Sequence, residues 1–221
     1  MAITDFLTNP TNAAEVIALI AALCTLTHRG SGYWSYFILY LSITIAIEIL
    51  GYYFRAVLKQ PNYPFYNFFM IFQALFFSYL FYMFQDSKKI RLWIPLAFGV
   101  FLVFFIVEGV MNSFSAYHKY SRQVLSVLVV SFCCIFYFSI LKLDSVKNPL
   151  TYPPFWIATG LFFFYFGSAV MFAFYDTVSK IKLSGTLSFY TLVMGCLSCI
   201  LYGSWIIGFI CRRKQMLSSS Q

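Results

Sequence analysis

Long apolar runs separated by short polar stretches organise the whole chain. The runs lie at about 12–28, 34–56, 65–84, 92–112, 122–142, 155–175 and 185–210, and the gaps contain turn formers and charges, such as KQPNYP at 59–64 and QDSKKIR at 85–91. A helix needs roughly 20 apolar residues to cross about 30 Å of hydrocarbon. A transmembrane β-strand would alternate apolar and polar residues, and these runs do not. The pattern predicts an all-α, polytopic membrane protein with seven transmembrane helices.

Composition supports this interpretation. Of the 221 residues, 61% are hydrophobic and only 10% are charged, whereas soluble domains carry about a quarter charged residues. We therefore expect residues 1–221 to form a single transmembrane domain without a soluble domain. The segment before the first run has no basic n-region and no clear cleavage site, so it is not expected to be a signal peptide. Thr11 or Asn12 is expected to cap the first helix, with Glu15 in its first turn.

Basic residues in the short loops predict the orientation. With the N-terminus outside, nine of the 15 Lys and Arg residues fall on the inner side and six on the outer side, and inner loops are usually the more basic. The chain is therefore expected to have its N-terminus outside and its C-terminus inside. The net charge of +8 is scattered over many loops, without the stripe that nucleic-acid binding needs. Contact with the lipid bilayer, including anionic lipid, explains it better.

Ionisable residues inside the second run are the main functional signal. Glu48, Tyr52 and Arg55 stand at i, i+4 and i+7, so they share one helix face. An unpaired charge at that depth costs at least a few kcal/mol, so this face is expected to look into the bundle or a wet cavity. For Arg55 alone, snorkelling to the outer headgroups is an alternative. In the predicted topology, further polar residues on the following spans lie towards the same membrane face: Asn67, Gln73, Glu108, Asn112, His118, Arg122 and Asp176.

Two interpretations of these ten residues remain open. They form an outward-facing polar pocket for an unknown small ligand, with Glu48 as its deepest ionisable group. Alternatively, Glu48, Glu108, Arg55 and Arg122 pair with one another and only lock the helix packing.

The sequence lacks the patterns of common catalytic and cofactor sites. It contains no G-x-S-x-G, H-E-x-x-H or nucleotide-binding motif. Its two histidines, His28 and His118, are expected on opposite sides of the membrane, so no metal site and no cofactor are predicted. Cys196 and Cys199 form a CxxC, which on a membrane helix is read as packing rather than redox chemistry. Small residues such as Gly160 favour close helix packing or, alternatively, a homodimer face.

Two short aromatic motifs resemble a known group of proteins. PNYPFYNFF at 61–69 and PFWIATGLFFFYFGS at 154–168 are similar to the starts of the third and sixth spans in small uncharacterised bacterial seven-helix membrane proteins, which occur alone or as input domains of signalling proteins. The resemblance implies a sensor in a bacterial inner membrane. This chain departs from the group at Gln73, where an acid is frequent, and no output domain is expected after Arg212. A signal is therefore expected to pass to a separate protein at the inner face.

The leading hypothesis is a non-enzymatic integral membrane protein, acting as a sensor or accessory signalling module through the outward-facing pocket. A small-solute or proton-coupled transporter is the alternative, with Glu48 and Glu108 loading protons. The absence of helices broken by proline near the midplane and of an internal repeat makes a transporter less favoured. A third hypothesis is an intramembrane lipid-modifying enzyme that uses Glu48 or Asp176 without a metal.

Overall fold

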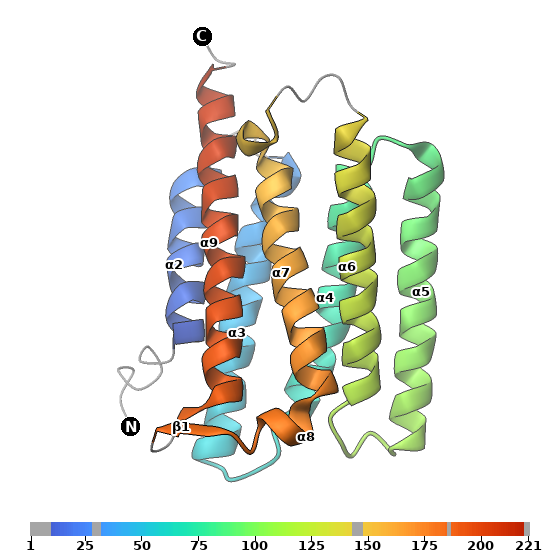
Figure 1. Ribbon diagram of the computed structural model, residues 1–221, viewed down its shortest axis with the longest axis vertical. Helices are drawn as coiled ribbons and strands as arrows, with labels where there is room; N and C mark the ends of the chain where they lie inside the picture. Colours follow the sequence, from blue (N-terminus) through green and yellow to red (C-terminus); the bar gives the residue numbers. More distant parts are fainter. Residues whose placement is uncertain (1–9, 28–31, 143–147, 185–186, 219–221) are drawn as a thin grey trace. The chain divides into compact units, whose positions relative to one another are not determined.

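The computed structural model describes residues 10–27, 32–142, 148–184 and 187–218, and they are almost entirely helical (Figure 1). The chain divides into two compact units, which are described separately. The terminal unit comprises Met1–Ile45 and Ile140–Gln221, and the central unit comprises Ala46–Ser139. The single domain expected for residues 1–221 stays a prediction.

The terminal unit is built around the longest helix. Its elements are α2 (Pro10–Leu26), η1 (Gly32–Ser35), the first part of α3 (Tyr36–Ala56), η2 (Pro149–Thr151), α7 (Pro153–Ala173), α8 (Tyr175–Val178), β1 (Lys182–Ser184), β2 (Leu187–Ser188) and α9 (Phe189–Ser218). Helix α9 packs against both α2 and α7. Figure 1 shows α8 and β1 at the end of this unit opposite the C-terminal end of α9. Edge-to-face contacts of Phe37 with Trp205 and Phe209, at ring-centroid distances of 5.1 and 5.4 Å, lie in its core.

The central unit contains the rest of α3, α4 (Tyr63–Phe84), α5 (Lys88–Met111) and most of α6 (Lys119–Leu141). Aromatic rings fill its core. Phe132 of α6 stacks on Phe98 of α5 at 5.7 Å and contacts Phe81 of α4 at 5.8 Å. These ring contacts therefore join α4, α5 and α6.

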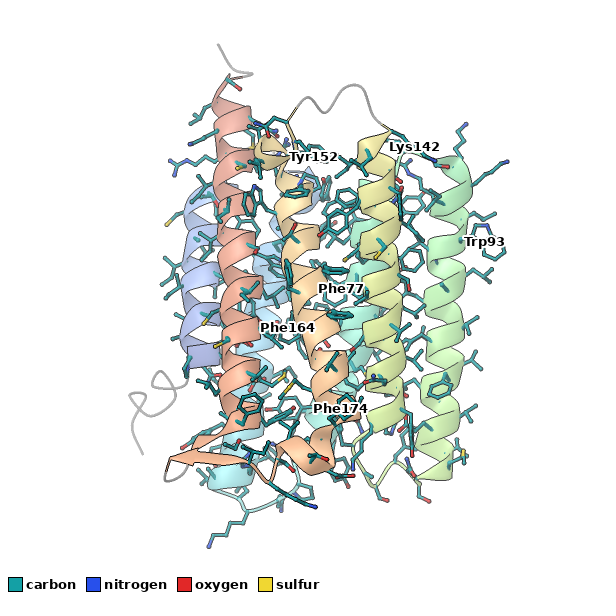
Figure 2. All side chains as sticks on the ribbon, viewed as in Figure 1. Phe77, Trp93, Lys142, Tyr152, Phe164 and Phe174 are labelled. Carbon is teal, nitrogen blue, oxygen red and sulfur yellow. The ribbon has the colours of Figure 1, made fainter. Side chains whose placement is uncertain are left out.

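Six of the described helices are long and apolar enough to cross a membrane, and α2, with 17 residues, is shorter. The prediction of a polytopic helical membrane protein is thus confirmed. Membrane crossing by α2 and the orientation of the chain stay predictions. Figure 2 shows Trp93 on the side of α5 that points away from α6, and its exposed fraction of 64% suits a lipid-facing residue.

Some helix boundaries differ from the expected ones. The last helix begins at Phe189 rather than near 185, because β1 and β2 form a short antiparallel pair there, and it continues to Ser218. Helix α5 begins at Lys88 instead of near 92, so Pro95 lies inside the helix and not in its first turn. Basic residues had suggested a loop, yet a helix continues readily past the hydrocarbon because water and headgroups satisfy its terminal amides.

Candidate functional site

A hydrogen bond joins the second apolar run to the third at the deepest predicted acid. The Tyr66 hydroxyl of α4 donates to Glu48 Oε2 of α3 at 3.1 Å. Gly51, one turn further along α3, makes this possible, because a Cβ at that position would lie 2.7 Å from the Tyr66 hydroxyl oxygen. The Asn62 side chain also donates to the Gly51 carbonyl at 3.4 Å. Glu48 itself is half-buried, and Tyr66 is its only hydrogen-bond donor among the described residues.

The same face of α4 carries a contact with a cation. Gln73 stands seven residues after Tyr66, so the two side chains project from one face, about 10 Å apart along the axis. Arg122 of α6 donates from Nη1 to Gln73 Oε1 at 2.9 Å. One stripe of α4 therefore contacts the Glu48 carboxylate at one level and the Arg122 guanidinium two turns further on.

Glu108 forms a different kind of contact from Glu48. It is 6% exposed and lies one turn before the C-terminal end of α5. Its carboxylate accepts from the Tyr120 amide at 3.1 Å, from the Ser121 amide at 2.7 Å and from the Ser121 hydroxyl. A carboxylate at these amides satisfies the start of α6 and matches the positive end of its dipole. Glu108 is thus a cap supplied by a neighbouring helix.

Asn67 fixes the segment between α5 and α6. Its Nδ2 donates to the Ala116 carbonyl at 2.9 Å, and its Oδ1 accepts from the His118 amide at 3.1 Å. In the same segment Ser113 and Phe114 both have φ of 51°, a region that costs non-glycine residues roughly 1–2 kcal/mol each. The Asn67 bonds and the Glu108 cap oppose that cost.

His118 is completely buried at this corner, with an exposed fraction of 0%. Its ring lies 4.5 Å from the Phe105 ring and 5.8 Å from the Phe114 ring. Neither ring nitrogen has a hydrogen-bond partner among the residues that the structure describes. The apolar contacts show that His118 packs here as an aromatic residue.

Tyr117 precedes His118 outside the helices. Burial raises the pKa of its hydroxyl above the ordinary tyrosine value; the Arg122 charge lowers this pKa and the Glu108 charge raises it further. The hydroxyl therefore belongs to the same electrostatic environment as these two charges, although Tyr117 was not among the predicted pocket residues. Its position in a short loop between spans gave no periodic signal.

The other predicted pocket residues are less enclosed. Tyr52 is half-buried, whereas Arg55 and Asn112 are exposed. Asn112 ends α5, and its amide donates to the Glu108 carbonyl at 3.0 Å. Asp176 is exposed and belongs to the terminal unit, so its place in the pocket stays a prediction.

A buried acid in the terminal unit was misinterpreted from the sequence. Glu15 is 3% exposed and accepts a hydrogen bond from the Tyr202 hydroxyl of α9 at 3.0 Å. Because α2 begins at Pro10, Asn12 lies inside the helix and Glu15 lies beyond its first turn. The expected capping and dipole roles were therefore wrong. Glu15 and Tyr202 are 187 positions apart, so no local pattern indicated the pair.

Among the described residues, no three His, Cys, Asp or Glu side chains come together as metal ligands. Cys196 and Cys199 are exposed on α9 and form no disulfide bond. Comparisons with protein-family models, curated proteins and solved structures gave no match.

Proposed function

We propose that this integral membrane protein is a non-enzymatic sensor or accessory signalling module, and that Glu48 is the group that responds. The supporting observation is the difference between Glu48 and Glu108, the two acids that lie on helices of the central unit. Glu108 accepts hydrogen bonds from two backbone amides and a hydroxyl, so removing its charge would weaken the cap of α6. Glu48 accepts one hydroxyl, at Oε2, and no described residue donates to its Oε1.

A half-buried carboxylate with an open oxygen can bind a proton or a cationic group without breaking a helix end. The response would be transmitted by Tyr66. Its ring packs closely against Gly51 of α3, and its hydroxyl donates a hydrogen bond to Glu48. Loss of negative charge at Glu48 weakens that charge-assisted bond, because hydrogen bonds to ionised groups are roughly twice as strong as neutral ones. The contact between α3 and α4 then changes.

The rest of the proposal follows the predicted topology. The N-terminus lies outside, the pocket faces outward and takes a small ligand, and the chain resides in a bacterial inner membrane. The signal passes to a separate protein at the inner face, where Arg212, Arg213 and Lys214 of α9 supply positive charge. Gly160 and Gly167 of α7 lie against α9, so a homodimer would use another face. The resemblance to bacterial input domains supports this assignment.

The test follows Tyr66 while Glu48 titrates. The full chain, with fluorotyrosine at position 66, is reconstituted in phosphatidylcholine nanodiscs, and its fluorine NMR resonance is recorded across acidic and neutral pH. We expect the resonance to move with pH and to stop moving in Glu48→Gln. Fluorotyrosine at position 63, one turn earlier on the same helix, is the matched control and is expected to stay unchanged.

The proposal is refuted if the resonance at position 66 does not shift with pH, or if it shifts by the same amount in Glu48→Gln. Proton flux into proteoliposomes is measured in parallel. Flux that requires Glu48 would replace the sensor with the proton-coupled carrier. Lipid turnover by the purified protein would replace it with the enzyme.

A further inference from the structure

The first turn of α5 has an unusual charge. It carries Lys88, Lys89 and Arg91 and no acidic residue. The N-terminus of a helix has a positive partial charge, so each exposed base there is unfavourable by about 0.3–1 kcal/mol at low ionic strength. An anion at this turn would remove the conflict.

The backbone of this turn also lacks a cap. Ser87 occupies the N-cap position, where its hydroxyl would ordinarily accept from a first-turn amide, but its side chain makes no such bond. The first helical hydrogen bond runs from the Arg91 amide to the Ser87 carbonyl at 3.0 Å. The amides of residues 88–90 therefore have no intrahelical acceptor and are oriented as in helix N-termini that bind phosphate.

Arg91 is held in place by α4. Its Nε donates to the Gln85 carbonyl, and its guanidinium carbon lies 5.2 Å from the centre of the Tyr82 ring. No described residue accepts a hydrogen bond from its Nη groups. These contacts fix the side chain and leave the two Nη groups to serve an external acceptor. The planar guanidinium can donate to two oxygens of one phosphate.

A buried donor lies just before this turn, at the end of α4. The Gln85 side chain is 1% exposed, and its Oε1 accepts from the Ser139 hydroxyl at 3.0 Å. Its Nε2 has no hydrogen-bond partner among the described residues. A buried donor left without a partner costs roughly 1–3 kcal/mol. Because this atom is buried, the Gln85 side chain would have to shift to give it a phosphate oxygen as a partner.

The depth of the turn in the bilayer identifies the source of the anion. With 24 residues, α5 is about 36 Å long, which exceeds the roughly 30 Å of hydrocarbon. Its first turn therefore reaches the headgroup level, and the exposed Trp93 suits the interfacial belt next to it. We propose that the first turn of α5 binds the phosphate of an anionic lipid headgroup through Lys88, Lys89, Arg91 and the backbone amides of this turn. This site is separate from the proposed response of Glu48.

Native mass spectrometry of the detergent-purified full chain measures the binding. Phosphatidic acid, phosphatidylcholine and inorganic phosphate are added in separate titrations. We expect phosphatidic acid to bind most tightly and Arg91→Gln to weaken it about five-fold, as the loss of one base near a lipid phosphate does. Arg213→Gln, which removes an exposed base from α9, is the matched control and is expected to leave binding unchanged.

Asp86 provides a second variant that does not depend on losing a contact. It is exposed and precedes the turn, so Asp86→Asn removes a repulsive charge and is expected to tighten binding. Thermal melting confirms that each variant is folded. Equal weakening by Arg91→Gln and Arg213→Gln, or no effect of Asp86→Asn, overturns the site in favour of diffuse charge attraction. Binding of inorganic phosphate as tight as that of phosphatidic acid would overturn the lipid as occupant and assign the site to the free anion.

Discussion

Replacing Glu108 by glutamine tests whether this acid is a cap for a neighbouring helix. The substitution preserves the size of the side chain but removes its charge and converts one oxygen to a donor. Turning the amide so that its oxygen faces Ser121 retains the 2.7 Å bond from the Ser121 amide and the bond from its hydroxyl. The new NH₂ group then faces the Tyr120 amide, whose 3.1 Å bond is lost.

The expected cost follows from these contacts. A hydrogen bond to an ionised group contributes about 1.5–3 kcal/mol and a neutral one about 0.5–1.5. The two retained bonds each lose about 1 kcal/mol, and loss of the third adds about another 1.5. Polar contacts in membrane proteins tend towards the lower values. We therefore expect Glu108→Gln to lower the free energy of unfolding by about 2–3 kcal/mol.

Equilibrium unfolding in mixed micelles, titrated with a denaturing detergent, measures this difference. Ser126→Ala is the matched control: Ser126 is fully buried on α6, but its hydroxyl donates to the Arg122 carbonyl of the same helix, so its loss is expected to cost less than about 1 kcal/mol. Ser121→Ala should give an intermediate value and should couple with Glu108→Gln in a double-mutant cycle. If Glu108→Gln costs no more than Ser126→Ala, the capping role of Glu108 is wrong.

Other substitutions test the remaining contacts. Gly109→Ala would place a Cβ 2.2 Å from the Phe114 ring and is expected to lower the free energy of unfolding by about 1–3 kcal/mol. Gly99→Ala on the same helix, where a Cβ would meet no atom within 4 Å, should leave it unchanged or raise it by up to about 1 kcal/mol. Equal melting temperatures of the two variants would contradict this. Burial raises the folded-state pKa of Tyr117, so the folded state holds this proton more tightly and stability should fall as pH rises above the unfolded value of 10.0. Tyr117→Phe should make that fall shallower in unfolding measured against pH, and an unchanged slope would refute it. Tyr202→Phe removes the donor to the buried acid of α2 and should cost about 1–3 kcal/mol in unfolding free energy; no measurable loss would show that this bond does not stabilise the terminal unit.

Candidate residues could be selected from the sequence, but their partners could not. Glu48, Asn67, Gln73, Glu108 and Arg122 stood out because charged and amide groups are costly within apolar runs, and each of them makes a specific hydrogen bond. The expected pairing of Glu48 and Glu108 with arginines did not indicate the hydrogen-bond donors that the structure shows for these two acids. Glu108 bonds to amides and a hydroxyl, and Glu48 bonds to a tyrosine hydroxyl. Backbone donors carry no residue signature, so a helix start 12 or 13 positions away could not be recognised as the partner of Glu108.

The membrane class and the approximate helix ranges followed from the sequence by itself. The thickness of the hydrocarbon sets the length of each apolar run, and the absence of water there requires each backbone segment to satisfy its own hydrogen bonds as a helix. Only the tertiary structure decided which polar groups meet, because a contact such as Tyr66 to Glu48 depends on the rotation and axial shift of two helices within a few ångströms. It also decided the roles of Gly51 and Gly109, since a missing Cβ has consequences only where another side chain occupies its place.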